Sequence, residues 1–319
     1  MSALRDGFRS VGRNFGLVLA VLATNLSLAL VLAAPLAREL RSDLANREAS
    51  RTMMYGFDYD WWSGWSDRQE GYAKTLAPDI LGRGFVFKSL DLLLKGNLPA
   101  GVFSGGAPDI DPLILGVATI YLLVQVFLTG GLLGVFRAPQ GGWTVRGLLH
   151  GSGFYFGRLV RLSLLSLALA GLVFALNAPF ARWIDARARE AVSGETAIAL
   201  TLGRHALLLV ALLLVHMVSS YAKVMVVLEE RLSAVLAFLS SLAFCARHFF
   251  AAFGQYLGVA AVGMVLLGAF SLIDARLGVV GWKSQLVALA LFQAFLAARI
   301  ALRLGLLASQ LELVRGRGR

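Results

Sequence analysis

The stretch LILGVATIYLLVQVFLTGGLLGVF, residues 113–136, runs for 24 residues without one charged side chain. A helix rises 1.5 Å per residue, so a run of this length spans the hydrocarbon core of a bilayer, which is roughly 30 Å thick. Backbone polar groups in lipid must be satisfied within the segment, which favours a helix. The stretch therefore predicts a transmembrane helix.

Five further apolar runs of similar length occur on either side of it. The first run follows Arg5, Arg9 and Arg13, and its length and the Pro35 context favour an uncleaved signal anchor over a cleaved secretory signal. The sequence thus predicts six spans in all, the other five being residues 16–36, 162–180, 198–218, 249–273 and 284–308.

The composition agrees with a membrane protein and excludes several other classes. Of the 319 residues, 58% are hydrophobic and 15% are charged, whereas about a quarter are charged in soluble domains. The mean hydropathy is +0.72. The single cysteine, Cys245, cannot form an intrachain disulfide or a Cys-x-x-Cys metal site. A cytosolic enzyme, a disordered tail and a small secreted scaffold are all excluded.

The distribution of charge predicts an orientation. If the N-terminus is cytoplasmic, the whole net charge of +11 falls on the inner side of the six spans. Such a bias follows the positive-inside rule and suits contact with anionic lipids of the cytoplasmic leaflet. We therefore predict a bacterial inner-membrane protein with both termini cytoplasmic, and no nucleic-acid partner.

The predicted fold is an all-α, polytopic membrane helical bundle with one extracytoplasmic segment and cytoplasmic amphipathic hairpins. The inner segments 137–161 and 222–248 are too apolar for free loops, so we expect each to form an interfacial or re-entrant hairpin. The expected order is a cytoplasmic N-terminus with a signal-anchor span (1–36), an extracytoplasmic segment (37–112), a five-span bundle (113–308) and a basic cytoplasmic tail (309–319).

The extracytoplasmic segment is rich in aromatic residues. An alternation with period two predicts an extended strand with four rings on one face. Three uses remain open: an aromatic belt at the outer interface, a platform for a lipid headgroup, sugar or partner helix, and a calcium loop, which matches poorly. The rings of this candidate interface are Tyr55, Phe57, Tyr59 and Trp61, with Trp62 and Trp65 following.

Two arginines in the last span and two glutamates in an inner segment suggest an ion pair. Arg299 and Arg303 lie on one helix face, and Glu229 and Glu230 lack obvious partners. We predict that at least one of these glutamates pairs with Arg299 or Arg303 and docks the hairpin on the sixth span. Snorkelling to lipid phosphates and a substrate or proton path are the alternatives.

Arg204, His205 and His216 are candidates for a polar seam in the fourth span. The two histidines are eleven residues apart, so they share a face but lie roughly 16 Å apart, too far to bind one metal. A seam of this kind would suit a proton relay. The alternative is a snorkelling arginine with two hydrogen-bonded histidines.

Motifs of catalysis and cofactor binding are absent from the sequence. There is no His-Glu-x-x-His, Gly-x-Ser-x-Gly, phosphate loop or Gly-x-Gly-x-x-Gly. We therefore predict a protein without catalytic activity, cofactor or metal.

Three stretches carry a resemblance to a known family. They are GGLLG at 130–134 with GSGFYFGRLVRL at 151–162, SYAKVMVVLEER at 220–231, and the segment 298–310. With Trp61 and Trp62 upstream, they resemble a family of bacterial six-span integral membrane proteins that has no assigned activity. The resemblance implies the six-span topology and no chemistry.

The favoured function is a non-catalytic accessory or scaffold subunit of a membrane complex, with a protein partner. The alternative is a transporter or lipid-handling protein with a cavity between spans two to five. A cavity lined by Gln125, Arg204, His205 and His216 would favour the alternative, and dry packing there would favour the scaffold.

Overall fold

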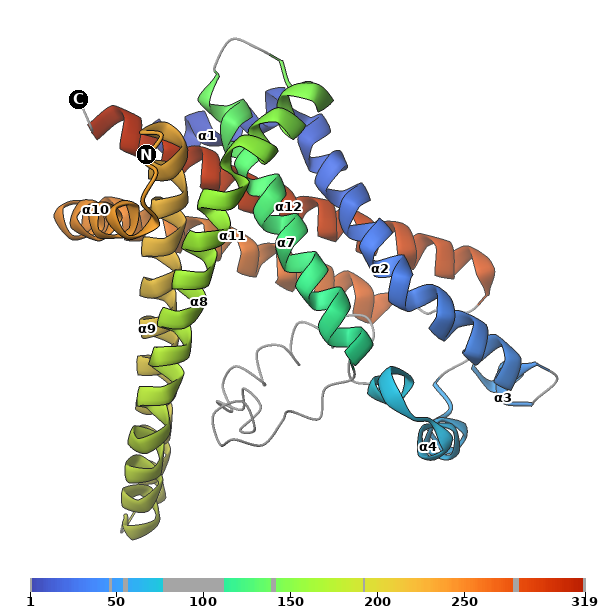
Figure 1. The fold of residues 1–319 in the computed structure, drawn as a ribbon. Coiled ribbons are helices and arrows are strands. Elements are labelled where there is room, and N and C mark those ends of the chain that lie inside the picture. The colour runs from blue at the N-terminus through green and yellow to red at the C-terminus, as the bar shows by residue number, and fades with distance from the viewer. Residues whose placement is uncertain are drawn as a thin grey trace.

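The computed structural model describes residues 2–45, 48–53, 57–76, 112–138, 142–191, 193–277 and 281–317. None of these residues lies in a strand, and six helices are long and apolar enough to cross a membrane (Figure 1). The all-α bundle with six candidate spans is confirmed. The six helices are α2 (Phe15–Leu44), α7 (Pro112–Arg137), α8 (Val145–Glu190), α9 (Gly194–Leu228), α11 (Phe249–Arg276) and α12 (Trp282–Arg317).

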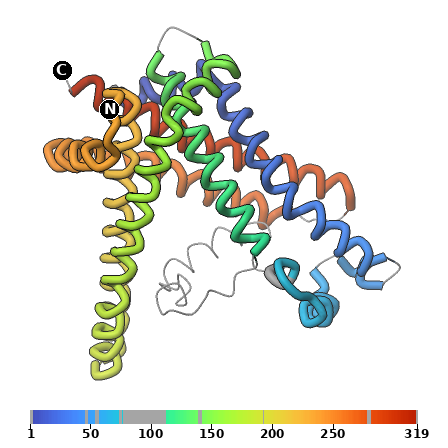
Figure 2. Tube along the Cα trace, in the orientation of Figure 1, coloured from blue at the N-terminus to red at the C-terminus, as the bar shows by residue number. Residues whose placement is uncertain are grey.

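The helices gather at one end and diverge toward the other (Figure 2). Both chain termini lie at the gathered end, which we call the terminal end; the opposite end is the distal end. Helices α8 and α9 pack against each other as a long arm. The 46 residues of α8 correspond to about 69 Å of helix, more than twice the thickness of a bilayer core.

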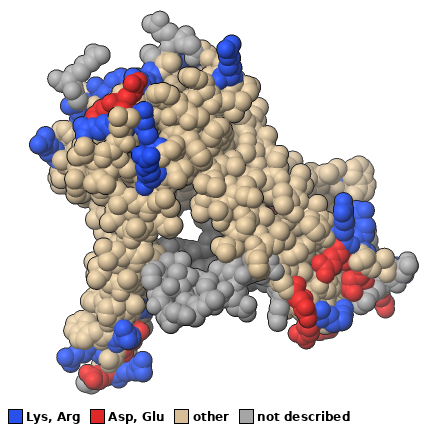
Figure 3. Space-filling view, in the orientation of Figure 1, with Lys and Arg blue, Asp and Glu red and all other residues tan. Residues whose placement is uncertain are grey.

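Charged side chains lie at both ends of the molecule, and a band between them carries almost none on the face that Figure 3 shows. Within the band, α8 and α9 expose large apolar side chains, such as Leu167, Leu176 and Leu202. In water such a surface would aggregate, whereas in a bilayer it faces lipid tails. The band marks the part of the bundle that crosses the hydrocarbon.

The tightly packed core lies at the terminal end. It contains residues 217–227 of α9 and 304–314 of α12 almost without interruption, joined by Leu17 and Val18 of α2 and Leu133 of α7. The distal halves of the same helices have few buried residues. The terminal end is therefore a rigid platform from which the spans diverge.

Neither end of the chain is a free tail. Helix α1 (Ser2–Arg13) packs along the last turns of α12, where Gly7 lies against the backbone of Ser309 and the ring of Phe8 lies against Gly305. Residues 309–317 of the predicted tail form the last turns of α12, and residues 318–319 lie outside the described residues. Likewise, the predicted segment 1–36 divides into α1 and the first part of α2. The arginines of α1 occupy one face of the helix, and its small and apolar residues occupy the other.

The predicted hairpin at 137–161 is also replaced by a helix. Thr144 caps the start of α8, its side chain accepting a hydrogen bond from the backbone N–H of Gly147 at 3.0 Å. From there α8 runs unbroken into the third span. Its Gly151 crosses Gly131 of α7 so closely that a Cβ at Gly131 would overlap Leu148 and Ser152. Small residues allow this close helix contact.

The predicted hairpin at 222–248 consists of two different parts. Residues 222–228 are the buried last turns of α9, and α10 (Ala234–Arg247) is a separate short helix that crosses the arm at the terminal end (Figure 1). Ala237, Ser241 and Cys245 form its buried face, and Ser241 donates a hydrogen bond to the carbonyl of Val218 at 2.8 Å. Burial raises the pKa of the Cys245 thiol to about 12.

The predicted extracytoplasmic segment 37–112 is described in part. Its first residues continue α2 to Leu44, and residues 77–111 lie outside the described ranges. Three short elements follow α2: α3 (Ala49–Thr52), α4 (Tyr59–Arg68) and a 3-10 helix, η1 (Gly71–Thr75). They lie at the distal end, away from both chain termini (Figure 1).

Candidate functional site

A cavity of about 540 Å³ with polar and charged residues in its walls lies between α7, α8 and α9, and we call it the central cavity. Arg303 of α12 also contributes to its wall. Its volume falls within the range of about 300–1,000 Å³ that is usual for ligand pockets. In the sequence analysis, a cavity between spans two to five was the feature expected of a transporter or lipid-handling protein. The central cavity lies between three of those spans.

The walls of the central cavity change from polar to apolar along its length. Ser219 and Lys223 of α9 and Thr129 of α7 line it toward the terminal end, whereas Leu167 of α8 and Leu212 of α9 line it toward the distal end. Lys223 and Leu212 are eleven residues apart on one helix, which corresponds to about 16 Å. The cavity is therefore an elongated slot with a polar head and a mainly apolar body, in which the hydroxyls of Thr119 and Ser166 bond to carbonyls of their own helices.

Two cations, Lys223 and Arg303, line the polar head. Arg303 donates a hydrogen bond to Oε1 of Gln125 at 2.9 Å. Among the described residues, neither cation lies within ion-pair distance of a carboxylate, and the Lys223 ammonium has no hydrogen-bond partner there. A cation at this depth of a membrane protein is costly unless an anion balances it. The polar head therefore carries positive charge that this part of the chain leaves uncompensated.

Two hydroxyl groups in the cavity walls also lack partners. The Oγ atoms of Ser163 on α8 and Ser219 on α9 are buried and make no hydrogen bond with any described residue. Ser219 is only 5% exposed. Buried hydroxyls usually have a partner, so these two are available to donate to an acceptor inside the cavity.

His216 belongs to this cavity, but the predicted seam does not exist as one unit. His216 Nδ1 lies 3.3 Å from the hydroxyl of Tyr256, which comes from α11. Arg204 instead lies near the distal end of the arm, with Nη1 3.9 Å from Asp185 Oδ2 on α8 and Nη2 3.1 Å from His205 Nε2. Arg204 pairs with Asp185 of the neighbouring helix, so Arg204 and His205 lie apart from His216. The spacing of these residues along one helix does not predict a contact with another helix.

The predicted pairing of Glu229 or Glu230 with Arg299 or Arg303 is wrong. Glu230 Oε1 lies 2.6 Å from Arg137 Nη1, and Glu229 pairs with Arg231. The sequence placed the end of the last span near 308, which put both arginines close to the glutamates. Because α12 continues to Arg317, Arg303 lies about 21 Å along the helix from its end.

The Glu230 carboxylate therefore anchors the α9–α10 turn on α7 and α8. Besides binding Glu230, Arg137 Nη1 donates to the carbonyl of Val227 at 3.0 Å and to the hydroxyl of Tyr155 at 2.9 Å. Arg158 Nη1 donates to the backbone carbonyl of Glu230 at 3.2 Å. This cluster fixes the turn at the terminal end of the arm.

The outer aromatic residues fold differently from the prediction. Tyr55 lies outside the described residues. Phe57 precedes a helix rather than an extended strand, because the Asp58 side chain accepts a hydrogen bond from the backbone N–H of Trp61 at 2.9 Å and caps α4. Period-two alternation over a few residues thus gave the wrong element.

Within α4 the tryptophans are packed and bonded rather than presented on one open face. Trp61 stacks on Trp65 with 5.7 Å between ring centroids, and Trp65 is fully buried. The Trp61 indole N–H donates to Asp43 at 2.9 Å and that of Trp62 to the carbonyl of Leu76 at 3.0 Å, while Tyr59 is 64% exposed. These bonds tie α4 to the end of α2 and to η1.

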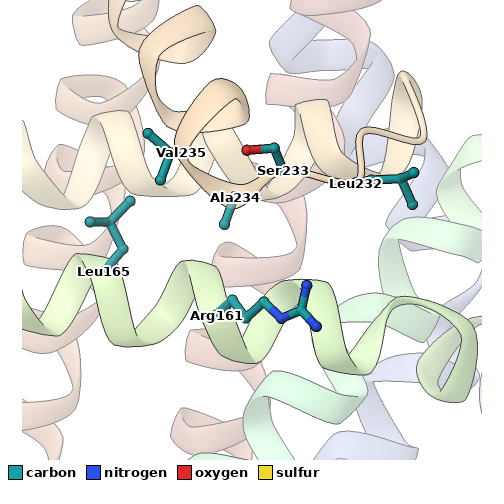
Figure 4. Close-up of a pocket in the computed structure, with 6 residues that line it drawn as sticks. All are labelled: Arg161, Leu165, Leu232, Ser233, Ala234 and Val235. Carbon is teal, nitrogen blue, oxygen red and sulfur yellow. The ribbon is translucent and has the colours of Figure 1, made fainter.

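Two other pockets occur in the described part of the protein. One, of about 410 Å³, lies between α2, α7 and α12 and includes Arg299 and Arg303; we call it the flank cavity. The other, of about 500 Å³, is a shallow hollow in which Arg161 and Leu165 of α8 face residues 232–235 (Figure 4). Arg161 is the only cation in its lining, so this hollow has fewer charged groups to bind a ligand than the other two cavities.

No metal centre accompanies these cavities among the described residues, since no three His, Cys, Asp or Glu side chains come together there. Comparison with protein-family models, curated protein sequences and solved structures finds no match to this chain. The resemblance to bacterial six-span proteins stays a prediction. The fold defines a multi-pass helical membrane protein.

Sequence reasoning found part of this cavity. It named Gln125 and His216 as cavity residues. It gave Arg303 only as a candidate ion-pair partner, and it assigned Lys223 to an inner segment because the apolar run ends at 218. The signal for Asn25, whose side chain bonds Gln125, was present: each is an isolated amide in an otherwise apolar run. Two lone amides in different spans are candidates to meet, because each needs a partner in lipid.

Proposed function

We propose that this protein is a lipid-handling membrane protein that binds an anionic amphiphile in the central cavity. The headgroup contacts Lys223 and Arg303, and the hydrocarbon chain occupies the apolar body of the slot. The observation that carries the proposal is a pair of intramembrane cations with no carboxylate partner among the described residues, at the head of an apolar cavity.

The charge of the head specifies the charge of the ligand. An anion is favoured, because it balances Lys223 and Arg303 in a medium of low dielectric constant. Arg303 keeps four of its five N–H donors free of described partners, and a carboxylate or phosphate accepts such donors well. The unpartnered hydroxyls of Ser163 and Ser219 add two further donors.

The apolar body favours a ligand with a hydrocarbon chain over a small inorganic anion. Most of its lining side chains outside the head are apolar, with leucines from α7, α8 and α9. A small anion would fill only the head. Two sources supply the required chemistry: a free fatty acid, or an anionic phospholipid with one chain in the slot.

The proposed setting is the bacterial inner membrane, with the terminal end facing the cytoplasm. The basic residues near that end support this orientation. The polar head then points toward the cytoplasmic leaflet, where anionic lipids supply the ligand. The accessory-subunit function that the sequence favoured, and its protein partner, stay predictions.

Analysis of co-purified lipid tests the proposal. The wild type and the K223M/R303Q double variant are purified in a mild neutral detergent, and bound lipids are extracted and quantified by mass spectrometry. K283M is the matched control, because Lys283 lies at the distal end of α12 over the Trp282 ring. We expect about one anionic lipid per wild-type and K283M chain and a loss of at least about tenfold in the double variant.

The identity of the retained species separates the two sources, since a fatty acid and a phospholipid differ in mass. Equal amounts of anionic lipid on the wild type and the double variant would contradict the proposal. So would a wild-type protein that retains only zwitterionic lipid.

A further inference from the structure

Arg303 lines the flank cavity as well as the central cavity. Like the central cavity, the flank cavity combines cations with apolar side chains. Arg299 and Arg303 lie on its α12 side, one turn apart, with the Tyr121 hydroxyl and the Asn25 amide opposite. Leu22, Leu26 and Ala29 of α2, with Leu296 and Ile300 of α12, complete its apolar wall.

One side chain separates the two cavities. Gln125 of α7 accepts a hydrogen bond from Arg303 and donates one to Asn25 Oδ1 of α2 at 2.7 Å. Gln125 and Arg303 both line the central cavity, and Asn25 and Arg303 both line the flank cavity. The Asn25–Gln125–Arg303 chain therefore forms a polar partition, with the guanidinium accessible from both sides.

We infer that the flank cavity is a second site for the same anionic headgroup, and that the two sites share Arg303 and so cannot be occupied at once. This inference rests on the proposed function of the central cavity. Each site combines Arg303 with one cation of its own, Lys223 in the central cavity and Arg299 in the flank cavity. An anion on one side draws the guanidinium toward it and leaves the other site with a single cation.

Because both sites use Arg303, binding of a lipid at one site affects binding at the other. A headgroup bound between Lys223 and Arg303 and a headgroup bound between Arg303 and Arg299 are alternatives related by a small reorientation of one side chain. Two lipid-facing sites on opposite sides of α7 then exchange occupancy through Arg303. A ligand on one side weakens binding on the other, which is negative coupling through a shared residue.

Photo-crosslinking tests this inference on the full-length protein in neutral phosphatidylcholine nanodiscs. The probe is hexadecanoic acid with a diazirine near the end of its chain, and the matching alcohol gives the charge-independent background. Cross-linked peptides are mapped by mass spectrometry: residues 163–170 of α8 report the central cavity, and residues 22–29 of α2 report the flank cavity. Intact mass gives the number of probes per chain.

We expect charge-dependent labelling of both peptides and no more than one probe per chain at saturation. R303Q lowers labelling of both peptides at least about tenfold, whereas K223M lowers only the α8 signal and R299Q only the α2 signal. R303K keeps the charge and retains labelling of both peptides, which separates loss of the site from loss of the fold.

Three results would contradict the inference. Labelling confined to α8 would remove the flank site and leave the proposed function standing. Two probes on one chain would show independent sites. Equal labelling by the acid and the alcohol at both peptides would remove the inference and the proposed function together.

Discussion

Arg303 of α12 donates a hydrogen bond to the Oε1 atom of Gln125 of α7, with 2.9 Å between nitrogen and oxygen. The amide nitrogen of the same side chain donates to Asn25 of α2 at 2.7 Å. One amide thus joins three spans that are distant in sequence. Its oxygen satisfies a single donor of the guanidinium and leaves the charge without a carboxylate among the described residues, which is why this position is suited to an anionic ligand.

A carboxylate placed next to Arg303 should pair with the guanidinium in place of the anionic headgroup of the ligand. In Q125E the new side chain has the shape of glutamine and supplies the missing negative charge, so we expect higher thermal stability without ligand and at least about tenfold weaker binding of an anionic amphiphile. The measurement is the unfolding midpoint in neutral detergent with and without hexadecanoate. A Q125E protein that hexadecanoate stabilises as much as the wild type would contradict the role of Arg303.

The crossing of α1 and α12 should be intolerant of side-chain bulk. A Cβ at Gly305 would overlap the ring of Phe8, so G305A should lower stability by about 1–3 kcal/mol. Gly254 is the matched control, since it has open space around it in α11. There, alanine should be neutral or stabilise the helix by up to about 1 kcal/mol. Thermal unfolding of both variants checks this, and equal midpoints would mean that α1 does not pack as described.

The α9–α10 turn should depend on Arg137 and Glu230. Their side chains are 36% and 53% exposed, so solvent weakens the pair and we expect a coupling energy of about 0.5–1 kcal/mol in a double-mutant cycle of R137Q and E230Q. The exposed pair Arg187–Glu190, at 3.5 Å, is the control and should give close to zero. A cycle of E230Q with R303Q should be additive, and strong coupling there would restore the pairing expected from the sequence.

Cys245 should resist alkylation while the protein is folded. Its pKa is raised to about 12 by burial, so below that pH the thiol holds its proton, and at pH 8 the reactive thiolate is roughly one part in ten thousand. We expect N-ethylmaleimide to label the wild type only after denaturation. In the background C245A, A246C places a thiol on the exposed face of α10 and should label at once. Rapid labelling of native Cys245 would mean that α10 is not docked on α9.

The spans could be predicted from sequence because each is an apolar run longer than a bilayer core is thick. Residues 113–136 anticipate α7 to within one residue at either end. The terminal end was harder to predict. Arg5, Arg9 and Arg13 suggest a solvated tail, yet their spacing of four residues leaves Gly7 and Val11 on the opposite face for α12. Charge marks one face of such a helix and says nothing about the other.

The site could be predicted only in pieces. Gln125 and His216 stand out as polar residues in apolar runs, but hydropathy ends the fourth span at 218, whereas packing extends α9 to Leu228. Lys223 therefore counted as a loop residue. The pairing of Asn25 with Gln125, 100 positions apart, depends on how α2 crosses α7, and no local pattern encodes that crossing.

The most direct test of the account is the headgroup preference of the purified protein. Hexadecanoate, hexadecyl phosphate, hexadecanol and hexadecyltrimethylammonium have the same chain and differ in charge, and their Kd values can be measured in neutral phosphatidylcholine nanodiscs. We expect the two anions to bind at least about tenfold more tightly than the alcohol or the cation, with the preference lost in the K223M/R303Q double variant and kept in K283M. Equal affinity for all four probes, or a preference that survives K223M/R303Q, would contradict the assignment of the central cavity as an anionic-lipid site.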